Sequence, residues 1–285
     1  MFHEEIVRSF DGTELYRCID APEPFRGTVV LLHGLGGHCR RFDEPVRRLN
    51  AAGWRVVRYD HRGHGRSGGA RACLNDYDDL VVDAKFIAGA ARRDAPGPLF
   101  TCGYSMGGLV SLLLGIRYPE GLSGQVFLGA CACELPLYRS FRRPQIGRIA
   151  MRTSPSVGSA LLSRDPDVAD EYDRDPWVLH AFTNKLLYEV FVRGVDDLTA
   201  SLHRHALPCL TLHGADDRLV PVESSRIIHS RSASPDKTLE ILPGCYHDIL
   251  HDAARDDAIS RIVAWMEGLD RKSTRLNSSH NQRSR

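Results

Sequence analysis

Short runs of apolar and β-branched residues recur along the chain, each bounded by glycine, proline or other turn-forming residues. They cover residues 27–32, 54–60, 99–104, 125–130, 209–213 and 238–242. Between most of these runs, apolar residues recur at helical spacing, over residues 41–52, 74–93, 106–118, 224–232 and 253–267. Strands that alternate with helices predict an α/β fold with a mostly parallel central sheet and helices on both faces. In such sheets ligands bind beyond the carboxyl ends of the strands.

One segment, residues 133–205, breaks this alternation. It contains several helical stretches and no clear strand, and it carries apolar side chains such as Leu161, Trp177 and Phe182. Because the segment falls between two sheet strands, we expect a helical lid folded over the carboxyl edge of the sheet. The alternative is a helical decoration whose aromatic side chains complete a small core of their own.

The length and composition fit this arrangement. A chain of 285 residues with 42% hydrophobic and 26% charged residues is typical of a globular protein with one large core, here residues 1–132 and 206–268. The first ten residues, MFHEEIVRSF, carry acids where a signal peptide needs a basic start and an apolar stretch. No run approaches the roughly 18 apolar residues of a membrane span. We therefore expect a cytoplasmic protein without an integral membrane span.

The charge is unevenly distributed between the body and the last residues. The final fifteen residues contribute five basic residues and no acid, so the remaining 32 basic residues face 36 acidic ones, a net charge of −4. A mildly acidic body argues against nucleic acid as a partner. Residues 269–285 lack apolar periodicity, and 270–280 resembles a translated sequencing adapter, so we expect a disordered, non-native tail. A disordered native tail is the alternative.

Two serines stand in a G-x-S-x-G pattern, which is typical of serine hydrolases. They are Ser105 in GYSMG and Ser67 in GRSGG. Such a nucleophile needs a strand that runs straight into the serine and a helix that begins just after it, so that the sharp turn exposes the hydroxyl. Ser105 follows the apolar run LFTCGY and precedes a helical pattern, whereas Ser67 follows a polar, glycine-rich loop. The context therefore favours Ser105 as the nucleophile.

A serine nucleophile needs a histidine base and a carboxylate that orients it. His247 follows the last predicted strand, where the chain order serine, acid, histidine places the base, and His251 is the nearby competitor. Asp216 and Asp217 both follow the run CLTLH, and their position alone does not separate them. Glu134, after the preceding strand, is a weaker third candidate for the acid.

Acyl transfer also needs amide donors for the developing oxyanion. The backbone N–H of Met106, next to Ser105, supplies the first. The second is expected from the glycine-rich turn HGLGG at residues 33–37, at the N–H of Leu35. The sequence shows no cluster of His, Cys, Asp or Glu at metal-ligand spacing, so we expect neither a metal nor an organic cofactor.

The stretches HGLGGH, DHRGHGRS, GYSMGG, HGADDRLV, SRDPDVADEYDRDP and PGCYHDILHD together resemble the α/β-hydrolase family of monoacylglycerol lipases and bacterial lysophospholipases, which is serine aminopeptidase S33-like. The resemblance spans nearly all of residues 1–268 in the right order. It implies an α/β-hydrolase fold and a lid that forms an apolar tunnel for an acyl chain. In the family motif G-x-x-D-x-x-V the acid is the fourth residue, which selects Asp217, and the loop that contains Ser67 is structural.

The resemblance also indicates substrate-binding candidates. Arg41 falls where the family has an arginine near the alcohol-binding end of the site, and Tyr104 precedes the nucleophile. Many members carry an acid where Gly37 stands and a histidine where Tyr104 stands. These departures leave the triad residues unchanged, and the expectation that they affect is recognition of a glycerol leaving group. With the lid residues Leu161, Trp177 and Phe182, Arg41 and Tyr104 complete the predicted binding set.

These observations predict a serine carboxylic ester hydrolase that acts on a lipid ester, monoacylglycerol or lysophospholipid, through an acyl-enzyme on Ser105. The lid is also a candidate for transient contact with a membrane surface. One alternative is an aminopeptidase of the proline-releasing type on the same fold. Another is an inactive hydrolase fold that serves as a small-molecule receptor. The sequence leaves open transfer of the acyl group to an alcohol other than water, and it does not indicate an oligomeric state.

Overall fold

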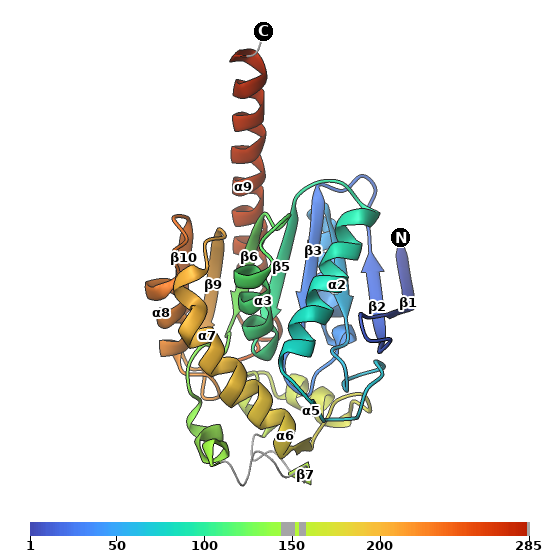
Figure 1. Ribbon diagram of the computed structural model, residues 1–285, viewed down its shortest axis with the longest axis vertical. Helices are drawn as coiled ribbons and strands as arrows, with labels where there is room; N and C mark the ends of the chain where they lie inside the picture. Colours follow the sequence, from blue (N-terminus) through green and yellow to red (C-terminus); the bar gives the residue numbers. More distant parts are fainter. Residues whose placement is uncertain (144–151, 154–157, 284–285) are drawn as a thin grey trace.

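A mixed sheet forms the centre of the computed structural model, which describes residues 1–143, 152–153 and 158–283 (Figure 1). Its eight strands run in the order β1-β2-β4-β3-β5-β6-β9-β10. β1 pairs antiparallel with β2, β2 pairs antiparallel with β4, and all other pairs are parallel, which confirms the predicted mostly parallel sheet. The strands are β1 Phe2–Arg8, β2 Glu14–Asp20, β3 Gly27–Leu32, β4 Trp54–Tyr59, β5 Leu99–Tyr104, β6 Gly124–Leu128, β9 Cys209–Gly214 and β10 Lys237–Leu242.

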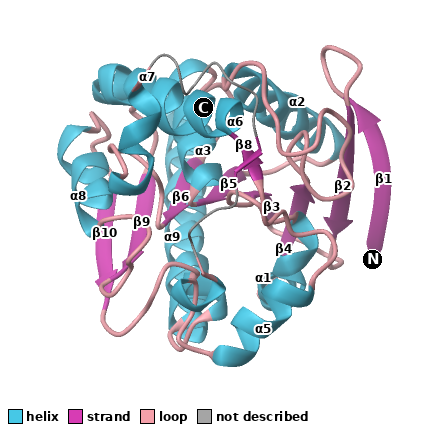
Figure 2. Cartoon of the chain, turned by 90° about the horizontal axis from the view of Figure 1, so that it is seen from below, coloured by secondary structure: helices cyan, strands magenta, loops and turns pink. Residues whose placement is uncertain are grey.

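Helices cover both faces of this sheet, as predicted (Figure 2). The helices of the core are α1 Asp43–Ala51, α2 Asp78–Asp94, α3 Met106–Arg117, α8 Val222–Arg231 and α9 Arg255–Arg283. α1 and α9 pack on one face, whereas α2, α3 and α8 pack on the other. None of the helices in the described part of the chain is long and apolar enough to cross a membrane.

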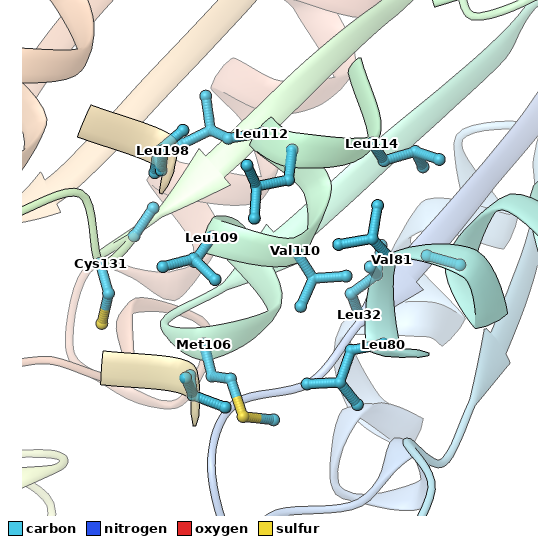
Figure 3. Packing of buried hydrophobic residues seen from close by; sticks show 14 of the residues in the cluster. Leu32, Leu80, Val81, Met106, Leu109, Val110, Leu112, Leu114, Cys131 and Leu198 are labelled. Atoms are coloured by element: carbon cyan, nitrogen blue, oxygen red, sulfur yellow. The ribbon is translucent and has the colours of Figure 1, made fainter. Parts of the chain in front are cut away.

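The strands separate two buried clusters because their side chains alternate between the faces. In β3, Val30 and Leu32 pack with α2 and α3, whereas Val29 and Leu31 pack with α1 and α9. Figure 3 shows the first cluster, in which Leu32 lies among side chains of α2 and α3. A parallel strand buried on both faces reads as a continuous apolar run, which is why these strands stand out in the sequence.

The antiparallel hairpin of β1 and β2 was not among the predicted strands. Most side chains of β1 are exposed, so its apolar pattern is weak. The sequence does contain a hairpin signal, since Asp11 and Gly12 lie in the connecting turn and Gly12 adopts a φ of +84°. A second difference lies in the inserted segment, where the two-residue strands β7 Arg152–Thr153 and β8 Phe182–Thr183 pair antiparallel.

The described part of residues 133–205, called the cap below, is mostly helical and lies at the lower end of the molecule in Figure 1. Residues 144–151 and 154–157 of the predicted lid lie outside the described residues. The cap contains α5 Pro166–Arg174, α6 Asn184–Tyr188, a π-helical turn at Glu189–Gly194 and α7 Val195–Ser201. Strand β5 leads directly to Ser105, which lines one cavity with residues of the cap, so the cap faces the carboxyl edge of the sheet.

Helix α9 differs from the expected end of the ordered chain. It runs to Arg283 and projects beyond the sheet, so residues 269–283 are helical where a disordered tail was expected (Figure 1). No glycine or proline follows Gly268, so nothing in the sequence interrupts the helix that begins at Arg255. Residues 284–285 lie outside the described residues.

Candidate active site

Ser105 occupies a strained turn between β5 and α3. Its φ of +54° lies in a region that residues other than glycine rarely adopt. The surrounding backbone holds this conformation, since the N–H of Ser105 donates to the carbonyl of Leu128 at 2.9 Å and its own carbonyl accepts from Gly108 at 2.9 Å. The turn therefore presents the hydroxyl at the carboxyl edge of the sheet.

Three glycines allow strand and helix to approach each other at this turn. A Cβ atom on Gly103 would lie 2.4 Å from the carbonyl oxygen of Gly107, and one on Gly107 would lie 2.3 Å from that of Leu32. A Cβ atom on Gly108 would lie 2.4 Å from the Cβ of Ala130. Side chains at these positions would push the helix away from the strands, so the glycines fix the position of Ser105.

The structure brings Ser105, His247 and Asp217 together in one chain of contacts. The Oγ of Ser105 lies 2.9 Å from Nε2 of His247, and Nδ1 of His247 lies 2.6 Å from Oδ2 of Asp217. His247 comes from the loop after β10 and Asp217 from the loop after β9. Only 8% of Ser105 and 3% of His247 is exposed, so the contacts are shielded from bulk water. This arrangement suits transfer of the serine proton to the imidazole.

Asp217 is held as an anion by several donors. Its Oδ1 accepts the N–H groups of Leu219 at 2.8 Å and Val220 at 2.9 Å. Burial raises the pKa of Asp217, but His247 and His213 act in the opposite direction and hold that pKa well below its usual value. His213, whose Nε2 lies 3.2 Å from Oδ2, is a contact that the sequence reasoning missed. Its place at the end of the strand before Asp217 is the signal that points to it.

The competing acids are engaged elsewhere. Asp216 pairs with Arg164 at the surface. Glu134 pairs with Arg139 and Arg142. Of the three carboxylates that the sequence offers as the acid, Asp217 is the one that contacts His247.

The competing histidine and serine also have other partners. His251 lies 2.8 Å from Asp248 through Nδ1 and 2.7 Å from the carbonyl of Arg41 through Nε2. Ser67 Oγ donates to the carbonyl of Asp60 at 2.6 Å. Both groups are thus used to hold loops together.

The glycine-rich loop at residues 33–37 packs against Ser105. A Cβ atom on Gly34 would lie 3.1 Å from the Cβ of Ser105. Among the hydrogen bonds of the described residues, none engages the N–H of Leu35 or Met106. Met106 begins α3, where the first amides have no partner within the helix. Both predicted donors are therefore available beside the serine.

His33 holds this loop in place. Its Nδ1 lies 2.8 Å from the carbonyl of Gly34, and its Nε2 accepts the N–H of His61 at 2.9 Å. Complete burial, and to a lesser degree the neighbouring His61 and His64, lower the pKa of His33 well below its usual value. The ring is therefore neutral, as its role as an acceptor requires.

A cavity lined mainly by apolar side chains extends from Ser105 and His247 into the cap. Its walls include Tyr104 and Phe182 from the predicted binding set. The further apolar and aromatic walls are Leu35, Cys131, Leu135, Leu137, Tyr138, Leu162, Tyr172, Leu179, Phe191, Leu219 and Val220. Cys131 Sγ lies 3.9 Å from Ser105 Oγ, and the sequence analysis missed it although it follows a strand that ends at the same sheet edge.

The other predicted binding residues lie away from this cavity. Leu161 does not line it, whereas its neighbour Leu162 does. Trp177 is 41% exposed and packs against Arg66, whose guanidinium carbon lies 5.3 Å from the ring centre. Arg41 lines a smaller adjoining pocket. Their participation in binding stays a prediction.

The cap contacts the glycine-rich loop directly. The N–H of Leu179 donates to the carbonyl of Gly36 at 2.8 Å. His38 Nε2 lies 2.8 Å from Oδ2 of Asp175. The position of the cap is thus coupled to the loop that carries Leu35.

In the part of the chain that the structure describes, no group of three or more His, Cys, Asp or Glu side chains is arranged to hold a metal ion. The hydroxyl of Ser105 and the imidazole of His247 line the cavity, and the amides of Leu35 and Met106 lie in the segments that adjoin Ser105. Together they suit attack on a carbonyl carbon and stabilisation of the resulting oxyanion.

Comparison with known proteins gives consistent matches over most of the chain. A family model described as "Serine aminopeptidase, S33" matches residues 23–254. The monoacylglycerol lipase of Mycolicibacterium smegmatis is 34% identical over 251 residues, covering 85% of this chain and 88% of that protein. The monoglyceride lipase of Rattus norvegicus is 30% identical over 232 residues, covering 79% and 76% of the two chains.

Solved structures confirm the α/β-hydrolase fold. The crystal structure of the monoacylglycerol lipase of Paleococcus ferrophilus matches with a TM-score of 0.80 and 29% identity, covering 90% of this chain and 99% of that one. A carboxyl esterase from Bacillus coagulans matches with a TM-score of 0.80 at 22% identity, which supports the fold alone.

Proposed function

The chain belongs to the serine aminopeptidase S33 family of α/β-hydrolases, and from this premise we propose that it hydrolyses the ester bond of a monoacylglycerol. The observation that carries the proposal is the continuous contact from Ser105 through His247 to Asp217 at the end of an apolar cavity. The names of the related lipases supply the substrate class. Lysophospholipid is the alternative head group to be tested.

In the proposed reaction, Ser105 Oγ attacks the ester carbonyl while Nε2 of His247 takes its proton. The amides of Leu35 and Met106 stabilise the oxyanion, and Asp217 stabilises the imidazolium. The alcohol then leaves with the proton from Nε2, and the acyl group remains on Ser105. Finally His247 deprotonates a water molecule that attacks this acyl group, which releases the carboxylic acid and restores the serine.

The cavity favours an ester with an alkyl chain over the amino terminus of a peptide. An aminopeptidase needs a carboxylate in the pocket to bind a free amine, and of the acids in 165–175 only Asp173 lines the cavity. Asp165 caps α5, and Asp175 pairs with His38. The walls are otherwise mostly aliphatic and aromatic, as an acyl chain requires.

The test compares substrates on the purified protein and on a Ser105→Ala variant. We expect hydrolysis of monoacylglycerol and of p-nitrophenyl esters, and none of prolyl-naphthylamide above the level of the variant. Faster hydrolysis of prolyl-naphthylamide than of the esters would show that the protein is an aminopeptidase. Faster release of fatty acid from lysophosphatidylcholine than from monoacylglycerol would show that the substrate is a lysophospholipid. Failure of a fluorophosphonate probe to label the folded protein would support a receptor without catalytic activity.

A further inference from the structure

A second concave surface lies far from Ser105, between α2 and the loop that joins α3 to β6. This groove has a volume of about 480 Å³. Its lining includes the apolar side chains of Phe86, Tyr118 and Leu122 and the cations Lys85, Arg92 and Arg93. Leu99 begins β5 and Ser105 follows its end, so the groove and the serine are separated by the length of a six-residue strand, about 20 Å.

Three cations that border the groove have no acidic partner among the described residues. Most arginines of the described residues pair with a carboxylate, but Lys85, Arg92 and Arg93 take part in none of these ion pairs. Glu120 is the only acid that lines the groove among the described residues. The local charge is therefore positive on a protein whose body is acidic, and it suits an anionic ligand.

The walls of the groove place two of these cations. Lys85 Nζ lies 3.9 Å from the ring centre of Tyr118. Arg92 folds over Gly121, where a Cβ atom would lie only 1.8 Å from its Nη1. All three side chains are exposed, with Lys85 over the ring of Tyr118 and Arg92 over Gly121.

Gly89 leaves space in the groove but makes helix α2 less stable than an alanine would. It lies inside α2, where glycine is less favourable than alanine by about 1 kcal/mol. A Cβ atom there would meet only Nη1 of Arg93, at 3.5 Å, so packing does not require glycine. The positions of Arg92 and Arg93 near the carboxyl end of α2 are explained by the helix dipole, but Gly89 is not.

We propose that this groove binds a single-chain carboxylate, with the alkyl chain on Phe86, Leu122 and Tyr118 and the carboxylate beside Lys85 and the two arginines. The apolar floor selects an alkyl chain and the cations select an acid. The volume of the groove falls in the range of pockets that bind one small ligand. The proposed reaction would release an acid of this kind, and that link alone rests on the proposed function.

The test uses dodecanoate that carries a photoreactive diazirine, added to a Ser105→Ala protein. After irradiation, mass spectrometry maps the labelled peptides. We expect label in residues 78–94 and 118–122, competed by plain dodecanoate and not by dodecanol. Label confined to peptides of the Ser105 cavity would overturn the proposal. The mapping does not depend on hydrolysis, so loss of the proposed activity and loss of this binding are separate results.

Two variants test the groove by different means. Lys85→Glu/Arg92→Glu/Arg93→Glu reverses the charge, and we expect labelling to fall about tenfold. Gly89→Leu keeps the charges and favours the helix but fills the groove, and it should reduce labelling equally with an unchanged circular dichroism spectrum. The matched control, Arg47→Glu/Arg204→Glu/Arg231→Glu, reverses three exposed cations elsewhere and should label as the parent does. Labelling that persists in both groove variants would overturn the proposal.

Binding to lipid vesicles tests whether the cations of the groove bind a free acid or a membrane surface. Sedimentation with vesicles of phosphatidylcholine and phosphatidylglycerol should be unaffected by Gly89→Leu. If the charge-reversed variant loses vesicle binding while dodecanoate labelling of the groove is unchanged, the cations serve a membrane surface and the proposal is wrong.

Discussion

Ser105 and Ser67 share the same glycine-flanked pattern and are both almost fully buried, yet their surroundings differ. Ser105 stands at a strained turn with its hydroxyl 2.9 Å from His247. The hydroxyl of Ser67 donates to the carbonyl of Asp60 at 2.6 Å and accepts the N–H of Tyr16 at 2.9 Å. The hydroxyl of Ser67 is thus hydrogen-bonded to backbone groups, whereas the hydroxyl of Ser105 faces the imidazole of His247. The pattern specifies a serine that the backbone approaches closely, and the elements around it decide what the hydroxyl does.

The histidines near the two serines differ in the same way. His61 and His64 lie in the loop of Ser67, and burial lowers their pKa to about 3 and about 4. These rings remain neutral at physiological pH and pack against His33. His247, in contrast, is fixed between a hydroxyl and a carboxylate. One region is therefore expected to govern stability and the other activity.

Removal of each hydroxyl in turn should separate the roles of the two serines. We expect Ser105→Ala to lower kcat for a p-nitrophenyl ester by about 10⁴- to 10⁶-fold, because the acyl-enzyme can no longer form. Ser67→Ala should retain activity within about threefold when assayed where it is folded. Mass spectrometry of fluorophosphonate-treated protein should find the adduct on the Ser105 peptide. An adduct on the Ser67 peptide would reverse the assignment.

Asp217 and its neighbour Asp216 allow a matched comparison of the next largest effect on kcat. Asp217→Asn should lower kcat by about 10⁴-fold, because the amide no longer stabilises the imidazolium or fixes its tautomer. Asp216→Asn removes only a surface ion pair with Arg164, and it should leave kcat within about twofold. A loss in Asp216→Asn as large as that in Asp217→Asn would contradict the assignment of the acid to Asp217 alone.

Acid should weaken the region of Ser67 through its histidines. Their pKa values are lower in the folded protein than the ordinary 6.5, so the unfolded chain binds more protons once the pH falls below about 6.5. The free energy of unfolding should therefore fall between about pH 6.5 and 4, by about 1.4 kcal/mol per pH unit for each such histidine. Urea denaturation at a series of pH values measures this slope.

His61→Phe sharpens that measurement. Neither ring nitrogen of His61 has a hydrogen-bond partner within the described residues, so phenylalanine preserves the packing without an unmet donor. The variant should be at least as stable at pH 7 and should show a shallower loss in acid. A slope identical to that of the parent would exclude His61 as a contributor.

The smallest expected effect concerns the structural role of Ser67. Ser67→Ala leaves the buried N–H of Tyr16 and the carbonyl of Asp60 without that partner, and should cost about 1–3 kcal/mol of unfolding free energy. Ser230→Ala, at an exposed position, is the control and should change stability by less than about 0.5 kcal/mol. Equal stability of the two variants would show that Ser67 does not support its loop.

The sequence allowed prediction of the elements that carry apolar runs or a helical apolar period. β5, Ser105 and α3 form a local strand-turn-helix unit, and its apolar runs and glycines are visible without knowledge of the fold. The β1–β2 hairpin was missed because an edge strand with exposed side chains carries little periodicity. Helix α9 continues past its predicted end because composition alone does not stop a helix that has already begun.

The sequence alone could not show which of two adjacent residues in a loop contacts the catalytic histidine. Asp216 and Asp217 are adjacent, and only the fold shows that one carboxylate is buried against His247 while the other faces Arg164. The cap presents the same difficulty, since Trp177 is a large aromatic residue, as expected of a cavity wall, but packs on Arg66 from a distant segment of the chain. Such choices depend on contacts between distant segments, which local patterns do not record.

The separation of the three site residues along the chain has a consequence for biogenesis. Ser105 lies 142 residues before His247, and 30 residues separate His247 from Asp217. A nascent polypeptide can therefore complete the turn around the serine long before its base has left the ribosome. The proposed chemistry is absent until the last loop docks, so probe labelling during refolding would time the arrival of that loop and not the earlier collapse.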